Sequence, residues 1–172
     1  MDLLDLCDIE TWQAFEDAIY ERSGLKPAVY NTEGIRIVQN PRWPNRLCPE
    51  IKATSKGQSF ICATAHMNLA NQARQSRQTV IEECDAGMVK LVTPIFVEDT
   101  FLGAVGGCGK VLDDGEVDSF LVNKITDIDE ERIEALSADV TAISMESARQ
   151  LADFIEKRVA QIVSDYSRRQ QQ

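Results

Sequence analysis

Four apolar residues near the start of the chain share one face of a helix, because they lie three or four positions apart: Ile9, Trp12, Phe15 and Ile19. Asp8 precedes this segment as an N-cap residue, and Gly24 follows it as a stop signal. The pattern therefore predicts an amphipathic first helix over residues 9–22.

Runs rich in β-branched residues predict five strands: residues 27–31, 34–39, 79–82, 88–97 and 101–111. Turn-forming residues between positions 31 and 34 predict that the first two strands form a hairpin. Residues 88–97 are apolar on both faces and therefore favour a central strand. Pro94 in that run has no N–H to donate, which favours a bulge or an unpaired position.

Helix-forming residues dominate between and after the strands. We expect a short helix over 48–53 and a longer one over 58–78, divided by Gly57. Residues 40–45, NPRWPN, predict a loop in which Trp43 is exposed or lies over a pocket. Three more helices are expected over residues 117–124, 129–138 and 138–166.

This order of elements predicts an α+β fold: a PAS- or GAF-like antiparallel sheet flanked by helices, with a long C-terminal signalling helix. Such folds hold small ligands between the sheet and the helices. We divide the chain into a sensory domain, residues 1–128, and a helical extension, residues 129–172.

The last helix carries an apolar stripe whose members follow alternating steps of four and three: Ala148, Ala152, Ile155, Val159, Ile162 and Tyr166. This spacing is typical of a coiled-coil seam when a second helix faces it, which would give a homodimer. The same stripe could instead pack on its own domain. Both interpretations stay open at this point.

Composition limits the classes of function. The chain has 172 residues, of which 44% are hydrophobic and 27% charged, as in ordinary soluble single-domain proteins. Its net charge of −10 opposes direct binding to nucleic acid or to anionic membranes. The first ten residues, MDLLDLCDIE, are acidic, and no apolar run approaches the ~20 residues that span a bilayer. We therefore expect a cytoplasmic protein.

Motifs for catalysis are scarce. The glycines between positions 103 and 109 do not form GxGxxG and lie inside a predicted strand, where glycine marks a bulge or a close approach. The chain has a single histidine, His66, on a predicted helix. A catalytic Cys–His pair would have to use it. We expect a protein that is not an enzyme.

The cysteines carry the remaining chemistry. Glutathione and thioredoxin keep cytoplasmic thiols reduced, so the five cysteines do not predict a disulfide framework. Four of them are separated by 13, 21 and 23 intervening residues without a CxxC pair: Cys48, Cys62, Cys84 and Cys108. This spacing is a weak metal signal and leaves packing, redox chemistry and metal binding open.

Three short motifs resemble the PocR sensory domain, a PAS-like ligand-binding module of bacterial and archaeal signalling proteins. They are Cys-Asp-Ala-Gly-Met at 84–88, Pro-Ile at 94–95, and Leu-Gly followed by Gly-Gly-Cys at 102–108. The similarity spans about residues 4–112. Cys48, followed by proline, and Cys62 resemble the family's other two cysteines. Asp85 and Cys108 depart from the family, which has histidine and glutamine at these positions.

The resemblance implies a sensory pocket lined by eight residues: Trp43, Cys48, Cys62, His66, Cys84, Asp85, Gly87 and Cys108. Three clustered family cysteines with Cys108 as a fourth would make a set of thiolates for a metal ion or an iron–sulfur cluster. The alternatives are a receptor for a small diol-like ligand, with structural cysteines, and a cysteine-dependent enzyme. The expected partners are a small ligand or cofactor, a second copy through the C-terminal helix, and a kinase or transcription regulator.

Overall fold

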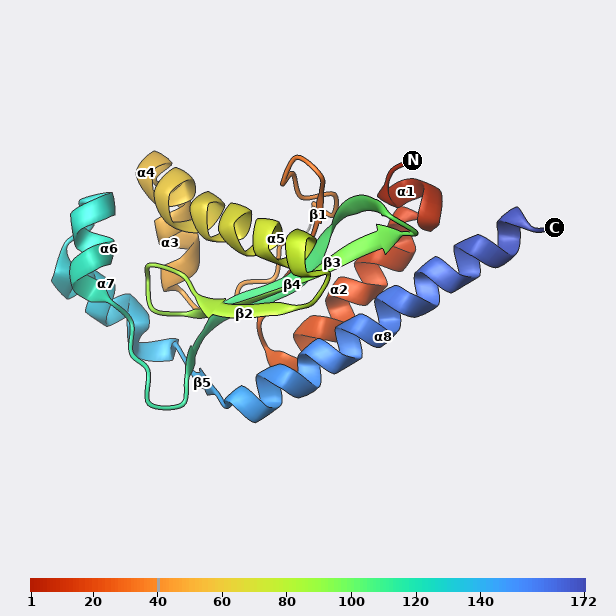
Figure 1. Cartoon of the computed structure of the whole chain (residues 1–172). Helices are drawn as coiled ribbons and strands as arrows, with labels where there is room; N and C mark the ends of the chain where they lie inside the picture. Colours follow the sequence, from red (N-terminus) through yellow and green to blue (C-terminus); the bar gives the residue numbers. More distant parts are fainter. Residues whose placement is uncertain (40) are drawn as a thin grey trace.

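The computed structural model describes residues 1–39 and 41–172. An antiparallel sheet with the strand order β1-β4-β3-β2 forms its centre (Figure 1). The strands are β1 (Lys26–Asn31), β2 (Val80–Glu83), β3 (Val89–Val97), β4 (Thr100–Leu112) and the short β5 (Ala142–Ile143). β5 pairs with β4 in parallel. With helices on both faces, the fold is of the predicted α+β class.

Helices cover the two faces of the sheet unequally. α5 (Thr64–Ser76) packs on one face, whereas α2 (Ile9–Ser23) and the long α8 (Met145–Gln170) pack on the other (Figure 1). Successive side chains of a strand point to opposite faces of the sheet, so each strand contributes to the packing on both sides. Leu91 of β3 contributes to the α2–α8 core, while its neighbour Val92 packs with Leu69 of α5.

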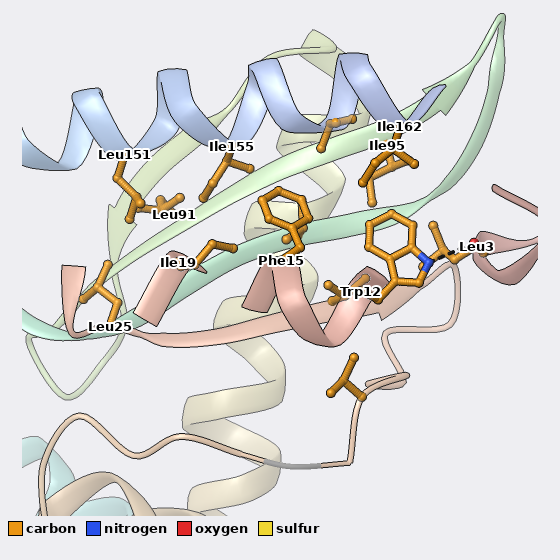
Figure 2. Packing of buried hydrophobic residues seen from close by; sticks show 14 of the residues in the cluster. Leu3, Trp12, Phe15, Ile19, Leu25, Leu91, Ile95, Leu151, Ile155 and Ile162 are labelled. Carbon is orange, nitrogen blue, oxygen red and sulfur yellow. Dashed lines mark hydrogen bonds between the residues drawn. The ribbon is translucent and has the colours of Figure 1, made fainter. Parts of the chain in front are cut away.

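The first predicted helix is confirmed as α2. The Asp8 carboxylate accepts a hydrogen bond from the Thr11 N–H at 2.8 Å, and Gly24 ends the helix in the left-handed conformation. Trp12 and Phe15 are buried between α2 and α8 (Figure 2). A short α1 (Leu3–Leu6), which the sequence did not predict, precedes α2.

The predicted strand over residues 34–39 is wrong. This segment keeps only one β-bridge, between Tyr30 and Arg36. The Arg36 guanidinium instead turns toward α2 and forms an ion pair of 2.6 Å with the buried Glu16. Of the predicted loop at 40–45, Asn40 lies outside the described residues, and positions 41–45 have no regular structure.

The helical middle is divided differently from the prediction. It consists of α3 (Leu47–Ala53), α4 (Ser55–Gly57), the π-helix η1 (Gln58–Ala63) and α5. The break falls at Thr54, whose hydroxyl caps α4 by accepting from the Gly57 N–H at 2.9 Å. Gly57 lies inside the helical region. Only glycine fits there, because a Cβ would collide with the Ile51 carbonyl oxygen.

The three later strands are confirmed as β2, β3 and β4, and β3 is central as predicted. Pro94 keeps its register with Ala104. The irregularities in the pairing of β3 with β4 fall next to it, between Ile95 and Phe96, and at the start of β3.

Beyond the sheet follow α6 (Ser119–Thr126), α7 (Glu130–Leu136) and the 3₁₀ turn η2 (Ser137–Asp139). The final helix begins at Met145 rather than near residue 138, because β5 intervenes and Ser144 caps the helix. No helix in the described part of the chain is long and apolar enough to cross a membrane.

The apolar stripe of α8 faces its own domain. Ala148, Ile155 and Ile162 are buried in the same core as Trp12 and Phe15. The stripe therefore packs on the sheet and α2 in this structure, while a homodimer through this helix stays a prediction. The division of the chain at residue 128 likewise stays a prediction.

Candidate ligand-binding site

A cavity of about 170 Å³ lies between the helical middle and the α5 side of the sheet. Its walls come from β1, α3, η1, α5 and the facing parts of β3 and β4. Six of the eight residues expected at a pocket line it: Trp43, Cys48, Cys62, His66, Cys84 and Cys108. The structure places Asp85 and Gly87 outside this cavity, in the turn between β2 and β3, with Asp85 exposed.

The apolar part of the cavity comes from residues that the sequence did not single out. Ile51 of α3, Ile61 of η1 and Met88 before β3 line it and belong to one buried cluster. That cluster also includes Val122 of α6 and Ile133 of α7. The two C-terminal short helices therefore support the cavity from behind.

The four cysteines meet around the cavity, and all are free thiols. Burial is the main cause that raises the pKa values of Cys48, Cys62 and Cys84 above the ordinary thiol value, and the neighbouring Cys108 side chain adds to it. These three thiols are therefore protonated at neutral pH. Cys7 lies away from the site, in the α1–α8 region, and burial raises its pKa to about 11.

The cysteines do not surround a point that a single ion could occupy. Among residues 1–39 and 41–172, no three His, Cys, Asp or Glu side chains are grouped closely enough to hold a metal ion. The four cysteines therefore line one cavity without converging on a single point.

Asn45 holds the start of α3 against the sheet. Its side-chain N–H groups donate to the Gly109 carbonyl oxygen at 2.8 Å and to Cys48 Sγ at 3.3 Å, and its carbonyl oxygen accepts from the Cys48 N–H at 2.7 Å. Asn45 is buried, and these hydrogen bonds satisfy its polar side-chain atoms, which would lower the stability of the fold if they were buried without partners. It fixes the position of Cys48 relative to β4.

Two lysines flank Cys108 across the sheet. In the strand register, Lys26 of β1 and Lys90 of β3 both lie opposite Cys108 of β4. Residues directly opposite each other in antiparallel strands point to the same face, with Cβ atoms ~5 Å apart. Lys26 and Lys90 are buried, and both line the cavity together with Lys52 of α3. The site is therefore cationic in an acidic protein.

Aromatic rings support these ammonium groups. Lys26 Nζ lies 4.7 Å from the ring centre of Trp43, and Lys90 Nζ lies 5.6 Å from that of Tyr30. The Tyr30 ring in turn stacks on His66, with ring centres 3.8 Å apart. The loop residue Trp43 thus lies against the cavity wall.

His66 is a neutral, buried residue. Burial, together with the nearby Lys90 and Lys52 ammonium groups, lowers its pKa to about 3. Its Nδ1 atom is buried without a hydrogen-bond partner in the part of the chain that the structure describes. His66 thus lies on a helix as predicted, and its side chain is buried rather than partly exposed.

A π-helix positions the middle of the site. Cys62 and Ile61 lie on η1, where the wider i→i+5 turn interrupts the α-helical path into α5. π-Helical turns are rare and are frequently found at functional sites. Local sequence propensity does not predict such a turn.

The sequence contains local signals that Lys26 and Lys90 could be buried. Lys26 precedes Pro-Ala-Val, and Lys90 is flanked by Val89 and Leu91. A lysine inside an apolar central strand is rarely buried without a reason. Such positions mark candidate site residues even before the strand register is known.

Comparison with known proteins gives one assignment. No curated protein and no solved structure matched the chain. A family model described as the sensory domain found in PocR matches residues 5–167, which include all elements that form the cavity. The chain therefore belongs to the PocR sensory domain family.

Proposed function

We propose that the cysteine- and lysine-lined cavity is the sensing site and that it binds a small organic ligand. The observation that carries the proposal is the cavity itself, which lies between sheet and helices and joins residues of β1, the helical middle, β3 and β4. Its volume of about 170 Å³ is similar to that of an engineered ~150 Å³ cavity that binds benzene. Binding without turnover fits a sensory domain.

Occupancy of the cavity would reach α8 through β3. Met88 and Lys90 line the cavity, whereas Val89 and Leu91 belong to the core that α8 shares. A shift of this strand on ligand binding would alter the packing surface of α8 on the opposite face. A signalling partner, such as a kinase or a transcription regulator, would then read the position of α8, either in one chain or in a homodimer.

Filling the cavity tests this proposal. Ala65 on α5 lines the cavity, and leucine there would occupy part of its space. Thermal-shift screening of the wild-type chain against diols, short carboxylates and amines is expected to find a stabiliser, because a ligand that binds only the folded form raises stability. Ala65→Leu should lose that stabilisation. Ala53→Leu, at an exposed position of α3, is the control.

The two variants must first show the circular-dichroism spectrum of the wild type. A stabiliser that acts equally on wild type and Ala65→Leu would bind elsewhere, and the cavity would not be the sensing site.

A second candidate ligand is an iron–sulfur cluster. The observation that favours a cluster is that four cysteines and three lysines line the same cavity, because a cluster held by thiolates carries negative charge. A cluster also spaces its thiolates more widely than a single ion does, since several iron and sulfide atoms lie between them. Each thiol would have to lose its proton on binding.

Anaerobic purification followed by iron and sulfide analysis and an absorption spectrum tests this candidate. A cluster predicts visible absorption that is lost in Cys108→Ser and kept in Cys7→Ser, since Cys7 lies outside the cavity. Colourless, iron-free protein with freely titratable thiols would exclude the cluster.

A further inference from the structure

The charge of the cavity restricts the chemistry of its ligand. Three lysines line it: Lys26, Lys52 and Lys90. The chain as a whole has a net charge of −10, so a site with three cations departs from the rest of the molecule. Buried positive charges are normally balanced by a negative charge nearby.

The protein does not supply that charge. Among residues 1–39 and 41–172, the ion pairs involve none of these three lysines. Of the residues lining the cavity, Glu33 alone carries a carboxylate, and it is exposed. Cys108 faces both Lys26 and Lys90, but its thiolate could neutralise only one of three positive charges.

Burial makes this imbalance costly. Lys26 is 6% exposed and Lys90 is 7% exposed. A buried ammonium group without a counterion is strongly unfavourable, and proteins normally pair it. Burial, with Lys52 and Arg36 nearby, lowers the pKa of Lys26 to about 8, while Cys108 acts in the opposite direction. For Lys90, burial also lowers the pKa, but Cys108 and Tyr30 outweigh it, so that its net pKa is raised.

The polar groups also gather at one end of the cavity. Lys26, Lys90, Tyr30 and His66 border a small adjoining space of about 10 Å³ against the sheet. The opposite walls are apolar, from Ile51, Ile61 and other members of the cluster behind α3. A ligand that matches both ends has a compact apolar body and one anionic head.

We infer that the cavity binds a small organic carboxylate, with its carboxylate between Lys26 and Lys90 and its apolar body against Ile51 and Ile61. This inference rests on the proposed function, since it names the class of ligand for the same cavity. The carboxylate supplies the missing counter-charge, and the apolar walls select for its body. The buried His66 Nδ1, which has no hydrogen-bond partner among residues 1–39 and 41–172, is a further polar group at this end of the cavity.

Matched pairs of probes test the inference. Benzoate and hexanoate are compared with benzamide and hexanamide, which keep the shape and remove the charge. Calorimetry at pH 7 is expected to show binding of the carboxylates and at least tenfold weaker binding of the amides. Lys26→Met and Lys90→Met should each weaken carboxylate binding by about 10- to 100-fold, the usual range for a lost charge-assisted hydrogen bond.

The Lys26 variant also has an opposite expected effect on stability without ligand. The site lowers the pKa of Lys26, so Lys26→Met removes an unfavourable buried charge and should melt at a higher temperature than the wild type without ligand. Lys124→Met removes the same charge at an exposed position away from the cavity and should change neither property. A merely structural lysine would not combine lost binding with raised stability.

The pH dependence follows from Lys26. Only its protonated form attracts a carboxylate, so affinity should be constant between about pH 6 and pH 8, where the ligand stays ionised, and fall above pH 8, approaching ~tenfold per pH unit. Lys90 remains protonated in this range because its net pKa is raised, and Lys52, Arg36 and Cys108 also lie close enough to act on Lys26. The fall should disappear in Lys26→Met, which separates the lysine from the thiol.

The outcomes separate the inference from the proposed function. If a diol or an amine stabilises the wild type in the cavity but no carboxylate does, the inference is overturned and the sensing site stands. Equal binding of benzoate and benzamide, or carboxylate binding that survives in both lysine variants, would also overturn the inference. If every probe leaves the wild type unchanged, both fail.

Discussion

Replacing Arg36 with methionine is expected to destabilise the protein by about 3–5 kcal/mol, because it leaves the Glu16 carboxylate buried without a counterion. Glu16 is 1% exposed on α2, and its pKa is already raised by burial despite the Arg36 guanidinium, which acts to lower it. One carboxylate oxygen accepts from Arg36 at 2.6 Å and the other from the Val29 N–H at 2.9 Å. This ion pair connects α2, β1 and the segment that enters the cavity loop.

Chemical denaturation at pH 7 measures this effect. A raised pKa means that the folded form holds a proton more tightly than the unfolded form, so the cost of an ionised Glu16 is present above its unfolded pKa of about 4.5 and disappears at lower pH. Arg36→Met should therefore lose less stability at pH 4 than at pH 7. The double variant Glu16→Leu/Arg36→Met removes both charges and should regain most of the loss.

A matched control is Arg42→Met, which breaks the half-exposed ion pair of Arg42 with Asp17. It should cost about 0–1 kcal/mol, as surface pairs do. A loss for Arg36→Met no larger than this, or one that is independent of pH, would contradict the role assigned to the buried pair.

Replacing Ile155 with alanine is the second large expected effect, a loss of about 2–5 kcal/mol in the free energy of unfolding. Ile155 lies on the inner face of α8 and is fully buried, in the core that also contains Phe15 and Leu91. Figure 2 shows it pointing from α8 toward these residues. The substitution leaves a cavity in the layer between α8 and the sheet.

This variant also separates the two interpretations of the α8 stripe. If Ile155 packs on its own domain, the loss should be the same at all protein concentrations. If it formed a coiled-coil seam, dissociation would accompany unfolding and the midpoint would depend on concentration. Lys157→Ala, at an exposed position of α8, should be nearly neutral. A concentration-dependent loss for Ile155→Ala would contradict the packing described here.

The elements that local pattern could predict are those whose signals lie within a few residues. The cap at Asp8, the period of the α2 face and the stop at Gly24 all act within one segment, and the structure agrees with them. The run at 34–39 has equally good β-branched composition but forms no strand. Within this run, Arg36 keeps one β-bridge to Tyr30, and its side chain pairs with Glu16 of α2, a contact between elements that local composition does not contain.

Local sequence pattern also predicted only part of the candidate site. The family motifs led to the four cysteines that line the cavity, because a motif is a local pattern that can be recognised without the tertiary structure. The apolar neighbours of Lys26 and Lys90 mark them as candidates, but their position opposite Cys108 depends on the strand register. Register is a property of three strands paired at once, and no single segment contains it.

By itself, the sequence determined that this chain folds as an α+β sensory module of the PocR family, because helix caps, strand patterns and short motifs are local and additive. Only the tertiary structure decided three features: that the α8 stripe covers its own core, that four cysteines and three lysines face one cavity, and that no carboxylate balances those lysines within the described residues. The physical reason is that burial and charge balance depend on neighbours brought together from distant segments.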